Sequence, residues 1–127
     1  MIRRPPRSTL SSSSAASDVY KRQAYEAFTE AFVRGAEGAG FERNYGLAAI
    51  GCGNFPRAEN RLERSLELDP ESIDAKVKLA YAKGYLGKKS EALALLADVL
   101  KAEPSNSDAQ RVREMVLKIP EGQDEDR

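Results

Sequence analysis

The sequence predicts an all-α protein in which antiparallel helix-turn-helix repeats stack into a solenoid. The main evidence is internal repetition: LELDP at Leu66–Pro70 returns as LKAEP at Leu100–Pro104, an offset of 34 residues. Small or apolar residues recur at the same offset, namely Ala48 and Ala82, Gly53 and Gly87, Ala58 and Ala92, Leu62 and Leu96, and Leu66 and Leu100. Such a period is typical of helical repeat proteins. The apolar content of 41% also suffices for one helical core but not for two domains.

The two units resemble the tetratricopeptide repeat (TPR). Residues 39–72 form the first unit, with Tyr45-Gly46, Gly53, Ala58, Leu62, Leu66 and Pro70 at family positions. Residues 73–106 form the second, with Leu79-Ala80, Gly87, Ala92, Leu96, Leu100 and Pro104. The resemblance implies a right-handed α-solenoid. Glu42 and Lys76 stand at the family's tryptophan position and Lys83 at its tyrosine position, so the packing between repeats is expected to differ there.

Elementary packing explains these landmarks. Small residues such as Gly46 and Ala80 let antiparallel helices approach each other, and leucines fill the remaining space. Gly53 and Gly87 are predicted where the chain reverses and a positive φ is needed. Pro56 fits the first turn of a helix, where no hydrogen bond is lost.

Partial units are expected on both sides of the two repeats. Residues 24–38 form a half repeat, because Ala24, Phe28, Ala31 and Phe32 fall on second-helix positions. Residues 107–119 form a capping helix, started by the polar cluster at 105–108 and ended by Pro120, with Val112, Met115, Val116 and Ile119 as a narrow apolar stripe. The chain then holds about two and a half units plus a cap. The acidic tail, residues 120–127, is predicted to be disordered.

Residues 1–23 carry five basic residues, one acid and a serine run. Residues 1–10 resemble the translation of a sequencing-library flow-cell adapter, and residues 13–23 that of a transposase adapter in the same frame. We therefore interpret 1–23 as a non-native, disordered segment fused within a repeat of a longer protein. The alternative is an authentic leader, since Arg3-Arg4 suggests twin-arginine export and the basic, serine-rich composition an organellar transit peptide. Against a leader, no apolar run follows the arginines and no apolar periodicity supports an amphipathic helix.

Composition and charge argue against several functions. The chain has no histidine, the commonest general base and metal ligand, and Cys52 has no second cysteine to pair with. Basic and acidic residues number 20 each, and without the five basic and one acidic residue of 1–23 the net charge is −4, which argues against nucleic acid binding. No stretch is long and apolar enough for membrane insertion. We expect no enzyme activity, cofactor or metal. The compartment stays open, with the cytoplasm favoured because the leader is not taken as a targeting signal.

Function is expected on the inner face of the solenoid. By the TPR resemblance, the first helix of each repeat lines a concave groove that binds a peptide or a segment of a partner protein. The positions carried over are Arg43, Leu47 and Ile50 from the first unit and Val77, Lys78, Tyr81 and Tyr85 from the second. Tyr81 and Tyr85 lie four residues apart and so share a helix face. The alternative is that both tyrosines pack against the neighbouring helix.

Other functions have less support in the sequence. Chaperone-tail binders of the family grip a terminal carboxylate with lysine, asparagine and arginine side chains. Arg43 suits one such position, but Leu47, Lys78, Asp108 and Val112 stand at others, so no clamp is expected. Acid-base chemistry without histidine is conceivable, yet Glu63, Glu67 and Asp69 with Arg61 and Arg64 fit a solvated helix face. The main alternative to ligand binding is a structural or homo-oligomeric role.

Overall fold

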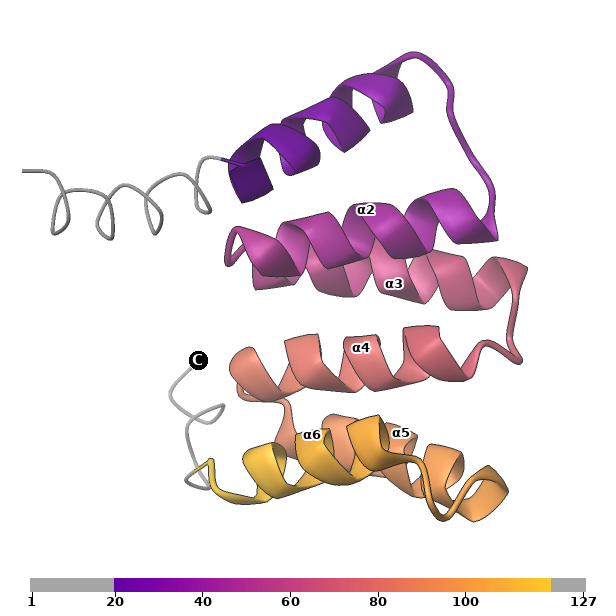
Figure 1. The fold of residues 1–127 in the computed structure, drawn as a ribbon, viewed down its shortest axis with the longest axis vertical. Coiled ribbons are helices and arrows are strands. Elements are labelled where there is room, and N and C mark those ends of the chain that lie inside the picture. Colours follow the sequence, from indigo (N-terminus) through magenta and orange to yellow (C-terminus); the bar gives the residue numbers. More distant parts are fainter. Residues whose placement is uncertain (1–19, 120–127) are drawn as a thin grey trace, which may run out of the picture.

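The computed structural model describes residues 20–119, which form six helices and contain no strand. The described part of the first helix covers residues 20–33. It is followed by α2 (Ala39–Gly51), α3 (Phe55–Leu68), α4 (Ile73–Tyr85), α5 (Lys89–Ala102) and α6 (Ser107–Leu117). Figure 1 shows the helices stacked from helix 20–33 at one end to α5 and α6 at the other. The all-α helical-repeat fold predicted from the sequence is confirmed.

Short polar side chains and glycines define the helix ends. Asn54, Ser72 and Asn106 accept hydrogen bonds from the backbone N–H groups of Arg57, Ala75 and Ala109, and so satisfy donors that helix geometry leaves free. Pro56 lies in the first turn of α3. After α2 and α4 the chain turns at Gly53 and Gly87, whose φ values of 78° and 82° are strained for any residue but glycine. These are the turns that the repeat spacing predicts.

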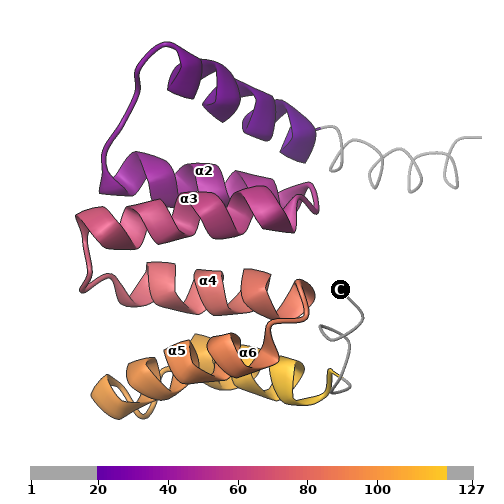
Figure 2. The same ribbon diagram turned by 180° about the vertical axis from the view of Figure 1, so that it is seen from behind.

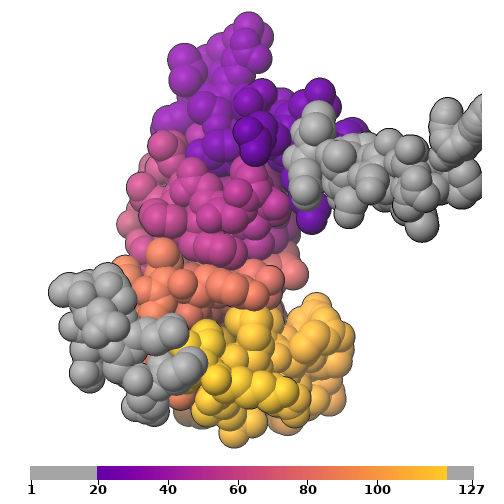
Figure 3. All heavy atoms as spheres, turned by 90° about the vertical axis from the view of Figure 1, so that its left-hand side faces the viewer, coloured from indigo at the N-terminus to yellow at the C-terminus, as the bar shows by residue number. Residues whose placement is uncertain are grey.

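The helices pack in pairs, α2 with α3 and α4 with α5, and α6 covers the end of the second pair. In Figure 1, α2 and α6 lie nearer the viewer than α3 and α5, and Figure 2 shows the opposite face. Figure 3 shows that the layers follow one another in sequence order along the stack. The first helix of each pair therefore contributes to one common face.

Two groups of buried side chains hold the stack together. The first includes Ala58, Leu62 and Leu79, and the second includes Leu96 and Val116. Helix α4 supplies residues to both groups. Because apolar burial is the main source of stability, α4 links the two halves of the stack energetically.

Helix 20–33 packs on α2 around Tyr45, whose side chain is fully buried. The Tyr45 ring meets four other rings, those of Tyr25, Phe28, Phe32 and Phe41, at centroid distances of 5.7 to 6.2 Å. Its hydroxyl donates a hydrogen bond to Thr29 Oγ1 at 3.0 Å. These contacts fix the half repeat on the first full unit.

The N-terminal boundary of the helical region differs from the expected one. The sequence predicts a disordered segment that includes residues 20–23, but these residues form the first described turn of helix 20–33. Lys21, Arg22 and Gln23 are good helix formers with exposed side chains, so they continue the helix without burying charge. The rest of the adapter-like segment and the acidic tail lie outside the described residues.

Candidate functional site

The face shared by α2, α4 and α6 contains a pocket between α4 and α6. Its volume is about 300 Å³, and it is lined by Val77, Lys78 and Tyr81 of α4 and by Asp108, Arg111, Val112 and Met115 of α6. Val77 forms a buried part of the wall at 2% exposure, while Val112 and Met115 are half-buried. The wall is therefore mainly apolar, with charged groups added by Lys78, Asp108 and Arg111.

Near their C-termini α4 and α6 approach each other closely, at Gly84 and Val116. A Cβ atom on Gly84 would lie 2.9 Å from Val116 Cγ2, so only glycine allows this approach. Lys89 Nζ, from the next helix, donates to the carbonyl oxygens of Leu117 and Ile119 at the end of α6. Toward their N-terminal halves the two helices leave the space that forms the pocket.

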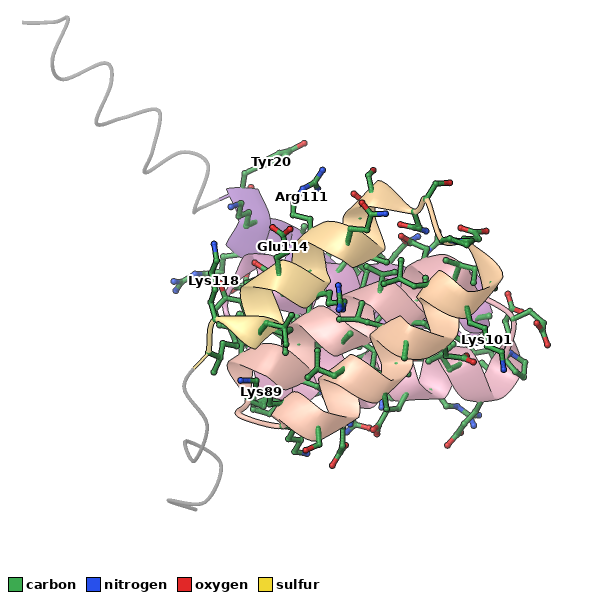
Figure 4. The ribbon with its side chains drawn as sticks, turned by 90° about the horizontal axis from the view of Figure 1, so that it is seen from below. Tyr20, Lys89, Lys101, Arg111, Glu114 and Lys118 are labelled. Carbon is green, nitrogen blue, oxygen red and sulfur yellow. The ribbon has the colours of Figure 1, made fainter. Side chains whose placement is uncertain are left out.

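The charged residues of this face are compensated unequally. Arg43 Nε lies 3.7 Å from Asp74 Oδ2, and Arg111 Nη1 donates to Asp108 Oδ1 at 3.1 Å. Figure 4 shows Arg111 projecting from α6 at the end of the stack. Lys78 is half-buried and forms no hydrogen bond or ion pair with any of residues 20–119. An uncompensated positive charge therefore lies beside an apolar pocket.

The two tyrosines of α4 have different environments. Tyr81 lines the pocket, and burial together with a hydrogen bond to Tyr85 raises the pKa of its hydroxyl, which stays protonated at neutral pH. Tyr85 stacks on Phe55 of α3 with ring centroids 4.6 Å apart and planes at 9°. The Tyr85 side chain is nevertheless 53% exposed. Tyr85 thus packs against the neighbouring helix, α3, while Tyr81 also faces the pocket.

The structure brings together part of the residue set expected from the sequence. Val77, Lys78 and Tyr81 meet at the pocket, whereas Arg43, Leu47 and Ile50 of α2 are not among its lining residues. Ile50 packs against the buried group that includes Leu62. The α6 half of the pocket was not among the expected site residues, although the repeat period could have found it. Adding the 34-residue offset to Val77, Lys78 and Tyr81 gives Arg111, Val112 and Met115.

The pattern of small residues, turn glycines and prolines is matched by the family model for the tetratricopeptide repeat over residues 49–116, more than half of the chain. The chain belongs to the tetratricopeptide repeat family. A solved structure, the "Arabidopsis OM64 TPR domain", is similar with a TM-score of 0.69 and 23% identity, covering 84% of this chain and 88% of that one. At this identity the likeness shows the TPR fold. No curated protein matches the chain.

Within the TPR fold, the charged residues at the usual tryptophan and tyrosine positions all pair with neighbouring helices. Glu42 of α2 accepts a hydrogen bond from Arg61 of α3 at 2.9 Å, and Lys76 of α4 donates to Asp98 of α5 at 2.7 Å. Lys83 Nζ donates to three carboxylates, those of Glu59, Glu63 and Glu91, at 2.8, 3.2 and 2.6 Å. The sequence suggested that Arg61 and Glu63 belong to a solvated helix face. In the TPR structure both instead pair with side chains of neighbouring helices.

A second hollow, of about 610 Å³, lies at the other end of this TPR stack. It is lined by Phe32, by four residues of the connection to α2 (Gly35, Ala36, Glu37 and Gly38) and by Glu42, Arg61, Arg64 and Leu68. The Arg61 guanidinium already pairs with Glu42 and lies 4.7 Å from the centre of the Phe32 ring. Its charge is thus compensated within the TPR structure, in contrast to that of Lys78.

Neither a metal-binding group of side chains nor a membrane-spanning helix is found among residues 20–119. No group of three or more histidine, cysteine, aspartate or glutamate side chains in this part could hold a metal ion. No helix of the described TPR region is long and apolar enough to cross a membrane. The family and fold are those of a protein–protein interaction scaffold.

Proposed function

We propose that this TPR chain is a non-catalytic scaffold that binds a peptide or a partner segment along the face formed by α2, α4 and α6. The observation that carries the proposal is the apolar pocket between α4 and α6, with Tyr81 and Lys78 at its edge. Concave sites that combine an apolar wall with a few polar groups are the usual places for ligands. An extended partner segment could continue from this pocket toward Leu47 and Arg43 of α2.

Peptide selection followed by a pocket-filling variant tests this proposal. Short random peptides are selected on the full chain, and the enriched peptides are measured by fluorescence anisotropy on the Val112→Arg variant. We expect at least a tenfold loss of affinity, because a long charged side chain fills the apolar pocket. Ala97→Arg, on the exposed side of α5, is the matched control and should bind normally. Equal binding by both variants, with circular dichroism showing both folded, would refute the α4–α6 pocket as the binding site.

A second function, homo-oligomerisation, is favoured by the exposed face of helix 20–33. Ala24 of this helix is exposed, whereas Ala58 and Ala92, which occupy the same position in the two full repeats, are 0% exposed. Val33 of the same helix is 77% exposed. Such a face is suited to cover by another helix, which a second copy of the chain could supply.

Mass measurement separates the two functions. Light scattering after size exclusion, over a wide concentration range, should give the monomer mass if the groove is the functional site. A mass that rises with concentration, and returns to the monomer value in Val33→Asp, would instead support oligomerisation through helix 20–33. Val112→Arg serves as the control that leaves this face unchanged.

A further inference from the structure

We infer that the ligand of the α4–α6 pocket is an internal peptide segment that inserts one large apolar side chain and places a side-chain carboxylate beside Lys78. This inference rests on the proposed function and specifies the chemistry of its ligand. It follows from the wall of the pocket, from the charge at its edge and from the donors that the pocket lacks.

The wall of the pocket selects an apolar side chain. Val77, Val112 and Met115 supply aliphatic and thioether surface, and Tyr81 also lines the pocket. The volume of about 300 Å³ is at the lower end of the range of roughly 300–1,000 Å³ for ligand pockets. A pocket of this size accommodates a side chain rather than a whole peptide. Because methionine adapts its shape, leucine, methionine and phenylalanine side chains all fit the chemistry of the wall.

The charge at the edge of the pocket selects an acidic neighbour. Of the two positive side chains that line the pocket, Arg111 is paired with Asp108, whereas Lys78 has no partner within residues 20–119. Lys78 is also half-buried, so a carboxylate beside it would be screened less than on an open surface. An apolar residue with aspartate or glutamate nearby therefore complements both features.

The donors around the pocket favour a side-chain carboxylate over a chain terminus. Tight capture of a terminal carboxylate requires several convergent donors for its two oxygens. At the pocket Lys78 offers the one charged donor without a partner among residues 20–119, because the Arg111 guanidinium already donates to Asp108. The Tyr81 hydroxyl is hydrogen-bonded with Tyr85, and Val112 and Met115 offer no donor. A single charge-assisted contact suits an aspartate or glutamate in mid-segment, whose peptide continues in both directions along the groove.

Two random peptide libraries test this inference on the full chain. In one the peptides are displayed internally with no free end, and in the other they carry a free C-terminal carboxylate. We expect enrichment in the internal library of leucine, methionine or phenylalanine with an acidic residue within a few positions. Enrichment confined to free C-termini, or peptides without the apolar and acidic pair, would overturn the inference and leave the proposed function intact. Absence of enrichment from both libraries would overturn both.

A charge-removal pair then tests the role of Lys78. The enriched peptide and its acid-to-amide version are titrated against the wild-type chain, Lys78→Gln and Lys101→Gln. Lys101 is the matched control because it is an exposed lysine on α5, shown in Figure 4. Lys78→Gln should weaken binding of the acidic peptide about three- to tenfold and leave binding of the amide peptide unchanged. The amide peptide already lacks the contact that Lys78→Gln removes. Equal effects of Lys78→Gln on the two peptides, or equal effects of the two lysine variants, would refute the contact.

Discussion

At the residue scale, the charged side chains that replace large TPR residues take part in the packing between helices. Arg61 pairs with the buried Glu42, and its guanidinium also lies over the Phe32 ring at 4.7 Å. Lys83 is 6% exposed and bridges α3 and α5 through carboxylates on both helices. Buried pairs of this kind add little net stability but cost much when one partner is removed. They therefore favour this particular arrangement of helices over alternatives that separate the charges.

Glu59 gives the Lys83 cluster a pH dependence. Burial raises the pKa of Glu59, but hydrogen bonds from Lys83 and Lys88 outweigh it and hold the pKa below the ordinary value. A depressed folded pKa adds stability that is complete above the ordinary value of 4.5 and is lost as the pH falls through the folded pKa. Glu59→Gln should lower the free energy of unfolding at neutral pH by about 1–3 kcal/mol.

The difference between Glu59→Gln and wild type should shrink in acid, because the wild-type carboxyl is then also neutral. Urea denaturation at neutral pH and well below pH 4.5 measures both values. Glu71→Gln is the control, since Glu71 is exposed and outside the cluster. A constant difference at both pH values would contradict this account of Glu59.

A substitution at Gly46 tests the close approach of α2 and α3. A Cβ atom at this position would lie 2.6 Å from Leu62 Cγ and 3.1 Å from Leu62 Cδ2, and Leu62 is fully buried. Gly46→Ala should therefore lower the free energy of unfolding by about 1–3 kcal/mol, although alanine is the better helix former. Gly40→Ala, with no atom near its Cβ, should stabilise by up to about 1 kcal/mol. Thermal and urea unfolding measure both, and equal effects of the two variants would disprove steric restriction at Gly46.

At the scale of elements, the repeat period predicted the helices and turns better than it predicted side-chain partners. Gly53 and Gly87 could be placed from the sequence because a tight reversal after a helix has few solutions. The pairing of Lys83 with carboxylates on α3 and α5 could not, because it depends on how three helices are oriented, and Glu59 and Glu63 lie 24 and 20 residues before Lys83. The same limit applies to Tyr85, whose stacking on Phe55 needs the relative position of two helices. At the pocket, the sequence predicts Val77, Lys78 and Tyr81 but not the α6 wall, because it predicts only a capping role for residues 107–119.

Helix 20–33 is expected to be the least protected of the helices described here. Its contacts are concentrated on the side that meets Tyr45, and Ala24 is exposed where Ala58 and Ala92 are fully buried. Amide hydrogens of helix 20–33 should therefore exchange faster than those of α3. Tyr45→Ala should accelerate them further and lower the free energy of unfolding by about 3–5 kcal/mol, as expected for a buried aromatic residue. Hydrogen exchange followed by mass spectrometry measures both, and equal protection of helix 20–33 and α3 in the wild type would contradict the prediction.

At the scale of the whole molecule, α4 joins two buried groups into one stack. Leu79, Ala75 and Ala82 pack with α2 and α3, whereas Val77 and Ala80 pack with α5 and α6. Repeat arrays have a stability that is roughly the sum of units and of the contacts between neighbours. The coupling between the two halves of this stack then depends mainly on α4, the same helix that forms one wall of the pocket.

Two side-chain truncations, one in each buried group, should raise amide exchange over different parts of the stack. Val116→Ala removes a side chain from one buried group at the end of the stack, so exchange should rise in α5 and α6 while α2 and α3 stay protected. Leu79→Ala opens a cavity between α4 and its neighbours in the first pair and should lower the free energy of unfolding by about 2–5 kcal/mol. A domain of this size has roughly 5–15 kcal/mol in total. Leu79→Ala should therefore raise exchange from α2 through α5. If it raised exchange in α2, α3 and α4 but not in α5, the two halves would be independent, and a ligand seated between α4 and α6 would leave α2 and α3 unaffected.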